Sequence, residues 1–252
     1  CHPNYFNVAW QNDSLHNGGG AYAQSAGYKN IFIMAPNYPA GTDALNGFKA
    51  LFEGDIAAEV YTKLGQTDYA AEIAQIRASE ADAVYFFLPG GMGISFLKQY
   101  SGSGVDIPVV GPAFSFDQGI LQAVGAAALG VRNTSQWNKD IDTPTNKAFV
   151  KSFQAEYSRL PSLYASQGFD TENLLVSAIE AADISDIESF RAALKAANFT
   201  SVRGDFKFGK NNHPIHDVYI REVIQEGDIF TNKIIGKVLS DHGDSYSKDC
   251  KM

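Results

Sequence analysis

Short apolar runs recur along the first half of the chain at nearly even spacing. They cover 31–35, 57–62, 83–88 and 107–111, so their starts lie 26, 26 and 24 residues apart. Runs of this length are typical of buried β-strands. Strand–helix–strand units at this spacing form parallel sheets with right-handed crossovers. The pattern therefore predicts an α/β fold.

Two of the segments between these runs have the period of an amphipathic helix. In 68–82, apolar residues recur at steps of four and three positions, and Asp68 is placed to cap or charge the first turn. In 42–52 the same period follows Thr42 and Asp43, and either of these residues would serve as the cap. We therefore expect one helix after the predicted strand 31–35 and another after the predicted strand 57–62.

The second half of the chain has a different pattern. Residues 133–144 are polar and irregular, and helical stretches follow at 146–157, 168–182 and 187–197. Alternating apolar residues then predict antiparallel strands with a hairpin turn at 226–228. If the protein has two lobes, we expect the chain to pass between them more than once.

Composition and charge exclude several classes of partner. The 252 residues are 45% hydrophobic, which is enough for a sizeable core. Twenty Lys and Arg against 28 Asp and Glu give a net charge of −8, without a block of like charge. This balance argues against a nucleic acid or an anionic membrane as partner. No apolar run reaches the roughly 18 residues that a membrane span needs.

Two cysteines lie near the ends of the chain, at Cys1 and Cys250. They could be unrelated thiols, or Cys1 could carry a lipid, although the residues after it have a strand-like pattern and form no obvious tether. We expect a disulfide between Cys1 and Cys250. Such a bond would place the protein in an oxidising compartment such as a periplasm.

Three loops follow predicted strands and occupy positions where a parallel sheet binds ligands. Segments 37–41, 88–93 and 111–118 lie where strands end and helices begin, and free N–H groups at helix N-termini attract polar ligand atoms. Ser115 and the backbone N–H groups are the candidate donors. The other notable side chains are aromatic, apolar or small: Tyr38, Pro39, Pro89, Gly90, Met92, Phe114 and Phe116. These loops favour a ligand with an apolar body and a polar head, although each loop alone could be an ordinary tight turn.

The sequence gives little support for a catalytic or metal-binding motif. The segment 90–96 has Phe96 where a dinucleotide fingerprint needs its last glycine, and Ser95 lies in no nucleophile elbow. His213 and His216 are separated by Pro214 and have no evident third ligand. We therefore expect no enzymatic activity, no cofactor and no metal.

Four segments in this order resemble one family along essentially the whole chain. They are "YKNIFIMAPNYPAGTDALNGFKALF", "GQTDYAAEIAQIRASEADAVYFFLPGGMGISFLKQY", "ASQGFDTENLLVSAIEAA" and "VRGDFKFGKNNHP". This combination is similar to the extracytoplasmic solute-binding proteins of branched-chain amino acid ABC importers.

The resemblance implies a receptor with two lobes of the periplasmic binding protein type I fold. Such a receptor captures a small solute between its lobes, closes by a hinge and delivers the solute to a membrane permease. We expect a periplasmic monomer, in which 1–12 and 135–215 belong to lobe one and 13–134 and 216–252 belong to lobe two.

The resemblance also implies a set of ligand-binding positions, which lie in the three loops and at the crossings between the lobes. They are Trp10, Asp13, Tyr38, Gly41, Pro89, Gly90, Met92, Ala113, Phe114, Ser115, Trp137 and Phe169. Alternatives stay open for three of them, because Trp10 and Trp137 could be core aromatics and Asp13 could cap a helix from Leu15 onward.

The chain departs from the family in two ways. Relatives carry an upstream block of βα units that builds most of lobe one, and we expect that block to be missing here. Amino acid binders also hold the ligand ammonium with an acidic residue near the third loop, where this chain has 113–115, Ala-Phe-Ser. Asp117 is close, but we expect it to cap the next helix. Burying an ammonium without a carboxylate is costly.

Two solute classes therefore remain open, an α-amino acid and an aromatic or aliphatic carboxylate. A ligand-sensing regulatory domain of the same fold is the alternative function. The sequence contains no DNA-binding helix pair, basic patch or membrane span that would connect such a sensor to an output.

Overall fold

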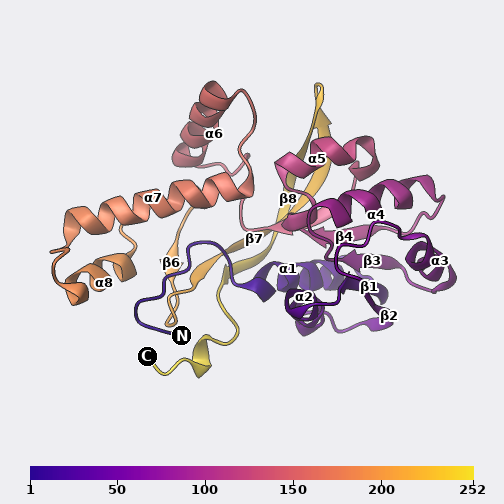
Figure 1. The fold of residues 1–252 in the computed structure, drawn as a ribbon, viewed down its shortest axis with the longest axis horizontal. Helices are drawn as coiled ribbons and strands as arrows, with labels where there is room; N and C mark the ends of the chain where they lie inside the picture. The colour runs from indigo at the N-terminus through magenta and orange to yellow at the C-terminus, as the bar shows by residue number, and fades with distance from the viewer.

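The computed structural model describes residues 1–252 and has the α/β architecture that the sequence predicts (Figure 1). Its strands follow the order β2-β1-β3-β4-β5-β7-β6, and β8 pairs with β7. The parallel strands are β1 (Asn30–Pro36), β2 (Asp55–Thr62), β3 (Ala83–Phe86), β4 (Val109–Pro112) and β5 (Arg132–Ser135). The antiparallel strands are β6 (Lys207–Phe208), β7 (Pro214–Glu226) and β8 (Ile229–His242).

Helices cover both faces of the parallel part of the sheet. Along β1, Ile31 and Ile33 pack with Leu45 and Phe48 on one face, whereas Phe32 and Met34 pack into a second cluster on the other face. This double burial explains the continuous apolar runs of the sequence. The helices of this half are α1 (Asn12–Ser25), α2 (Pro39–Ala50), α3 (Ala70–Ala78), α4 (Gly91–Gly102) and α5 (Gln118–Val124).

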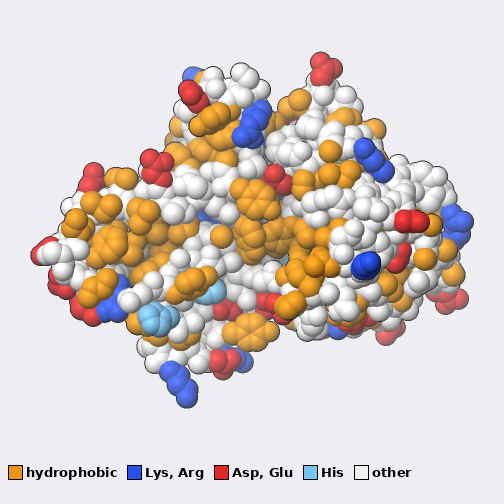
Figure 2. Space-filling view, in the orientation of Figure 1, with side chains coloured by type: hydrophobic (Ala, Val, Ile, Leu, Met, Phe, Trp, Pro, Cys, Tyr) orange, Lys and Arg blue, Asp and Glu red, His pale blue; other side chains and the backbone are white.

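The other half consists mainly of helices (Figure 1). It contains α6 (Pro144–Tyr157), α7 (Leu163–Ala181) and α8 (Ile187–Ala196), together with the two-residue strand β6. Three side chains on α7, Leu175, Val176 and Ile179, are 43%, 47% and 52% exposed. Figure 2 shows hydrophobic side chains gathered over α7 and α8. This half therefore leaves an apolar helix face in contact with solvent.

Strand β7 joins the two halves. Its first residues, Pro214 and Ile215, pair with β6, whereas Tyr219 to Glu222 pair with β5. The turn predicted at 226–228 is confirmed, because β7 ends at Glu226 and β8 begins at Ile229. No helix of the protein is both long enough and apolar enough to cross a membrane.

Several local predictions are wrong. Helix α2 begins at Pro39, so Tyr38 is the N-cap in place of Thr42 or Asp43. Proline is well suited to the first helical position because its fixed φ matches the helix and its missing N–H needs no partner there. Helix α7 begins at Leu163 instead of 168, and residues 1–10 form no strand.

Cys1 and Cys250 are joined by a disulfide in the structure, with 5.6 Å between their Cα atoms. The bond ties the two ends of the chain together, and Figure 1 shows both termini on the same side of the molecule.

We expect intact-mass analysis under denaturing conditions to detect this disulfide. Without a reductant, alkylation should add no group to the protein, whereas after reduction it should add two groups, one for each cysteine. Incorporation of two groups before reduction would show free thiols and contradict the bond.

Candidate functional site

The three predicted loops lie at one edge of the sheet. They follow β1, β3 and β4, and these strands are neighbours in the order β1-β3-β4. Because the strands are parallel, their carboxyl ends meet at the same edge, which is where open α/β sheets bind ligands.

Six rings form a connected group, here called the aromatic cluster. They lie in or directly before the loops, in or just before α1, and in α7. Phe87 is central: its ring centroid lies 6.3 Å from that of Tyr38 in a stacked arrangement and 5.7 Å from that of Phe114. Trp10 lies 4.9 Å from Phe114 and 6.0 Å from Tyr164. The members are Trp10, His16, Tyr38, Phe87, Phe114 and Tyr164.

The aromatic cluster has a buried base and an accessible rim. Phe87 and Phe114 are 4% and 6% exposed, whereas Tyr164 is 50% exposed and Trp10 and Tyr38 are half-buried. Burial also raises the pKa of Tyr38, so its hydroxyl stays protonated at neutral pH. Stacked and tilted rings of this kind suit a flat apolar ligand.

Two helix N-termini beside the cluster lack a side-chain cap. Helix α2 begins after β1 and α4 begins after β3, and no side chain accepts a hydrogen bond from their first turns. By contrast, Asp117 caps α5, as predicted. Uncapped backbone N–H groups attract the polar or anionic part of a ligand.

Glycines allow these helix starts to form. A Cβ atom on Gly41 would lie 1.9 Å from the carbonyl oxygen of Pro36, so only glycine lets α2 approach the end of β1 so closely. Gly90, the N-cap of α4, has φ of 62° and ψ of −133°, a conformation that strongly favours glycine.

Donors and acceptors of the third loop are already engaged. The Ser115 hydroxyl is fully buried and donates to the carbonyl oxygen of Leu88 at 2.7 Å, so it braces the second loop against the third. Asp117 accepts from the backbone N–H groups of Gly119 and Leu163. Ala113 is buried in the core. Residues 113–115 therefore offer no carboxylate to an ammonium. Burial and the Asp117 carboxylate raise the pKa of Tyr164, and this carboxylate is engaged as a helix cap.

Other predicted site residues lie away from the aromatic cluster. Met92 packs on the face of the sheet opposite to the aromatic cluster, and its sulfur accepts a hydrogen bond from the Gly65 N–H. Asp13 lies in the first turn of α1, where Gln11 is the cap, and its carboxylate raises the pKa of Tyr246. Pro89 is half-buried beside Gly90.

Trp137 and Phe169 belong to a second group of rings. Trp137 is buried and donates its indole N–H to Asn146, and its ring lies 6.1 Å from Phe149. Phe149 in turn lies 4.9 Å from Phe169. Trp137 is thus packed in the core, as expected from the alternative interpretation that it is a core aromatic.

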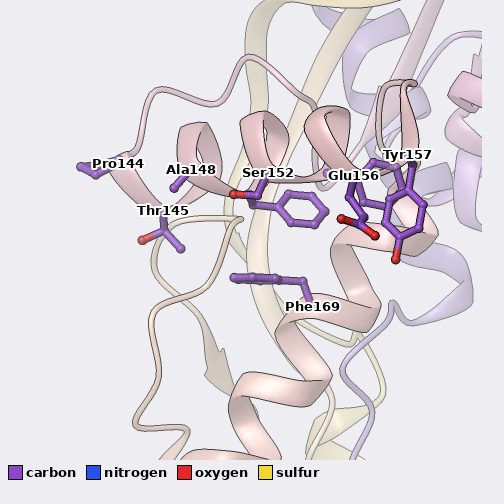
Figure 3. Close-up of a pocket in the computed structure, with 9 residues that line it drawn as sticks. Pro144, Thr145, Ala148, Ser152, Glu156, Tyr157 and Phe169 are labelled. Carbon is purple, nitrogen blue, oxygen red and sulfur yellow. The ribbon is translucent and has the colours of Figure 1, made fainter.

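Phe149 and Phe169 line an open hollow of about 620 Å³ between α6 and α7. Figure 3 shows Phe169 reaching from α7 toward α6, with Glu156 and Tyr157 facing it from α6. The hollow is largely apolar and separate from the aromatic cluster. Of the predicted site residues, only Phe169 lines this hollow.

His16 is the most buried polar member of the aromatic cluster. It projects from α1, is fully buried, and its Nδ1 lies 2.6 Å from the Tyr85 hydroxyl. Burial lowers the pKa of His16 to about 3, so the ring is neutral at physiological pH. Its ring lies 5.0 Å from Phe87 and 6.0 Å from Phe114.

Sequence reasoning missed His16, Phe87 and Tyr164. Phe87 lies directly before the second loop, within the predicted strand 83–88. This position was the only feature of the sequence that could have indicated Phe87 as a site residue. Tyr164 lies on α7, which was predicted to begin only at 168, and His16 lies on α1, which the sequence indicated only as the alternative in which Asp13 is a helix cap. The described residues contain no group of three or more His, Cys, Asp or Glu side chains placed to hold a metal.

Residues 1–228 match the family model described as "Periplasmic binding protein". The Leu/Ile/Val-binding protein homolog 6 of Brucella melitensis is 28% identical over 217 residues, which are 82% of this chain and 56% of that protein. The chain thus spans about half the length of the curated relatives that it matches.

Solved structures resemble the whole chain. An ABC transporter solute-binding protein from R. palustris in complex with benzoate is 31% identical, with a TM-score of 0.91 over 100% of this chain and 70% of that one. A solute-binding protein from Rhodopseudomonas palustris BisB5 in complex with 3,4-dihydroxybenzoic acid is 26% identical, with a TM-score of 0.79 over 93% and 66%. The chain therefore belongs to the periplasmic binding protein family and has the type I fold of ABC transporter solute-binding proteins.

Proposed function

We propose that this protein is the extracytoplasmic solute receptor of an ABC importer and that its solute is an aromatic carboxylate. The aromatic cluster is the observation that carries the proposal. It presents rings for a flat apolar body and lies beside two uncapped helix N-termini for a negatively charged head.

The choice between the two solute classes rests on charge. An α-amino acid brings an ammonium group, and burying it without a carboxylate partner costs several kcal/mol. The third loop offers Ala113, Phe114 and Ser115, and Asp117 is engaged as a helix cap. The complexes of two relatives with benzoate and dihydroxybenzoic acid support the same choice.

The remaining parts of the proposal follow from the family. The receptor acts in the periplasm as a monomer, changes no bond of its solute and delivers the solute to a membrane permease. Lobe one is formed by 1–12 and 135–215, and lobe two by 13–134 and 216–252. Closure would bring lobe one over the part of the aromatic cluster that lies in lobe two, with Trp10 and Tyr164 of lobe one at the boundary.

A thermal-shift screen tests the solute class. The panel contains leucine, valine, phenylalanine, benzoate, hydroxybenzoates, a hydroxycinnamate and short aliphatic acids. A ligand at one hundred times its dissociation constant adds about 2.7 kcal/mol, or roughly 5 to 10 °C for a chain of this size. We expect a shift with the aromatic acids alone. A shift confined to the amino acids would overturn the choice of solute.

A further inference from the structure

A buried polar atom in the aromatic cluster has no hydrogen-bond partner. This atom is Nε2 of His16. Its ring lies against Phe87 and Phe114, which come from the second and third loops. A buried polar group without a partner costs about 1–3 kcal/mol, so its presence in a folded protein calls for an explanation.

The protonation of His16 follows from its neighbour. Tyr85 is fully buried, its pKa is raised well above the usual value, and its hydroxyl bonds only to Nδ1 of His16. If the hydroxyl donates, Nδ1 accepts, and the imidazole proton is on Nε2. The other tautomer would leave both the Tyr85 proton and the Nε2 lone pair unpaired. The first arrangement leaves one group unpaired instead of two, so His16 presents an Nε2–H donor.

The surroundings of this donor determine what it can bind. It lies among aromatic rings, where burying a charged carboxylate is costly, so a neutral oxygen is the better acceptor. The carboxylate of an aromatic acid is better placed at the N-termini of α2 and α4, where Ala40 is half-buried and Gly91 is exposed. The two ends of such a solute would then meet different partners.

We infer that His16 is a specificity-determining residue whose Nε2–H donates to a hydroxyl substituent on the solute ring, so that the protein prefers hydroxylated aromatic acids to benzoate. This inference rests on the proposed function, because it concerns the same site. In the structure Nε2 is buried and the His16 ring lies against Phe87 and Phe114, so binding requires a neighbouring side chain to move. Phe114 is the better candidate, because it lies in the three-residue turn Ala113–Ser115.

The test treats the solute hydroxyl and His16 as the two members of a double-mutant cycle. Dissociation constants of benzoate, 3-hydroxybenzoate and 4-hydroxybenzoate are measured for the wild type and for His16→Phe. A site that is built to bond a hydroxyl rejects the analogue that lacks it. We expect the wild type to bind one hydroxybenzoate about 10- to 100-fold more tightly than benzoate, and His16→Phe to abolish this ratio.

Two further variants and one spectrum keep the test decisive. His16→Gln keeps an N–H donor and should retain part of the ratio, whereas His216→Phe changes another fully buried histidine, on β7 and outside the cluster, and should leave the ratio unchanged. Nitrogen-15 NMR of the wild type should find the imidazole proton of His16 on Nε2. This measurement does not depend on whether any variant folds.

The possible outcomes separate the two proposals. If the wild type binds none of the three acids, the proposed solute class fails and the inference fails with it. If the wild type binds them but shows no preference, or if His16→Phe keeps the preference, only the inference is overturned. A proton on Nδ1 would also overturn it.

Discussion

Replacing Arg203 with alanine is expected to lower the free energy of unfolding by about 3 to 5 kcal/mol. Arg203 and Asp170 form an ion pair at 2.9 Å, and neither side chain is exposed. Arg203 also donates to the carbonyl oxygens of Val8 and Ala9, and Asp170 accepts from Ser201 and the backbone of Val202. The substitution would leave a buried carboxylate without its cation.

Urea unfolding of two variants measures this effect. Arg203→Met combined with Asp170→Leu removes both charges and should cost less than Arg203→Ala alone, because no buried charge is left unpaired. A loss below about 1 kcal/mol in the single variant would mean that the ion pair contributes little. Arg203 also holds the segment that leads into the aromatic cluster, since Val8 and Ala9 directly precede Trp10.

Replacing Gly41 with alanine is expected to weaken both the fold and the site. The new Cβ atom would lie 1.9 Å from the Pro36 carbonyl oxygen, so α2 must move away from the end of β1. Such overpacking typically costs about 1–3 kcal/mol. Tyr38 precedes this turn, so its ring would shift relative to Phe87. We expect benzoate binding to weaken by about tenfold or more, as for the loss of one aromatic contact.

A second glycine provides the matched control. Gly168 lies within α7, and a Cβ atom there would meet nothing within 4 Å. Gly168→Ala should therefore raise the free energy of unfolding by up to about 1 kcal/mol and leave binding unchanged. Equal behaviour of the two variants in unfolding and in calorimetric titration would contradict the role assigned to Gly41.

Much of the fold could be predicted because the apolar runs of the sequence coincide with strands of the parallel sheet. The strands predicted at 31–35, 57–62 and 83–88 are found at β1, β2 and β3, each within two residues at either end. In β1 and β3 the apolar residues alternate between two hydrophobic clusters, so no polar position interrupts these runs. The edge strand β2 differs, because it contains Glu59 and is mostly half-buried or exposed.

Helix α1 was predicted only as an alternative, in which Asp13 caps a helix from Leu15 onward, because its sequence has weak helix propensity. Gly18, Gly19 and Gly20 follow one another in its middle, and glycine disfavours helices. Tertiary packing explains their presence: a Cβ atom on Gly20 would lie 2.1 Å from the Phe48 carbonyl oxygen, and one on Gly19 would lie 2.6 Å from the Tyr85 ring. Close packing of α1 therefore overrides local preference, and it also carries His16 into the aromatic cluster.

Strand β5 was missed because its buried residues are polar. Asn133, Thr134 and Ser135 are fully buried, which no hydrophobic pattern reveals. Their partners are distant in sequence: Asn133 accepts from Arg221, and Thr134 donates to the Leu15 carbonyl oxygen. Satisfied hydrogen bonds make this burial possible.

The candidate site was only partly predictable for a similar reason. Strand ends and loop composition indicated Tyr38 and Phe114, since these residues lie in loops that follow parallel strands. His16 and Tyr164 join them through helices that arrive from elsewhere in the chain. Contacts of this kind depend on the tertiary fold, and a single sequence carries little trace of them.

The most direct test of the account is calorimetric titration of the unmodified protein with benzoate and 4-hydroxybenzoate, followed by mass spectrometry of the recovered solute. The account predicts saturable binding of one molecule per chain, with the solute recovered chemically unchanged. Binding of neither acid, or conversion of a bound acid into another compound, would contradict the central claim that this protein captures an aromatic carboxylate.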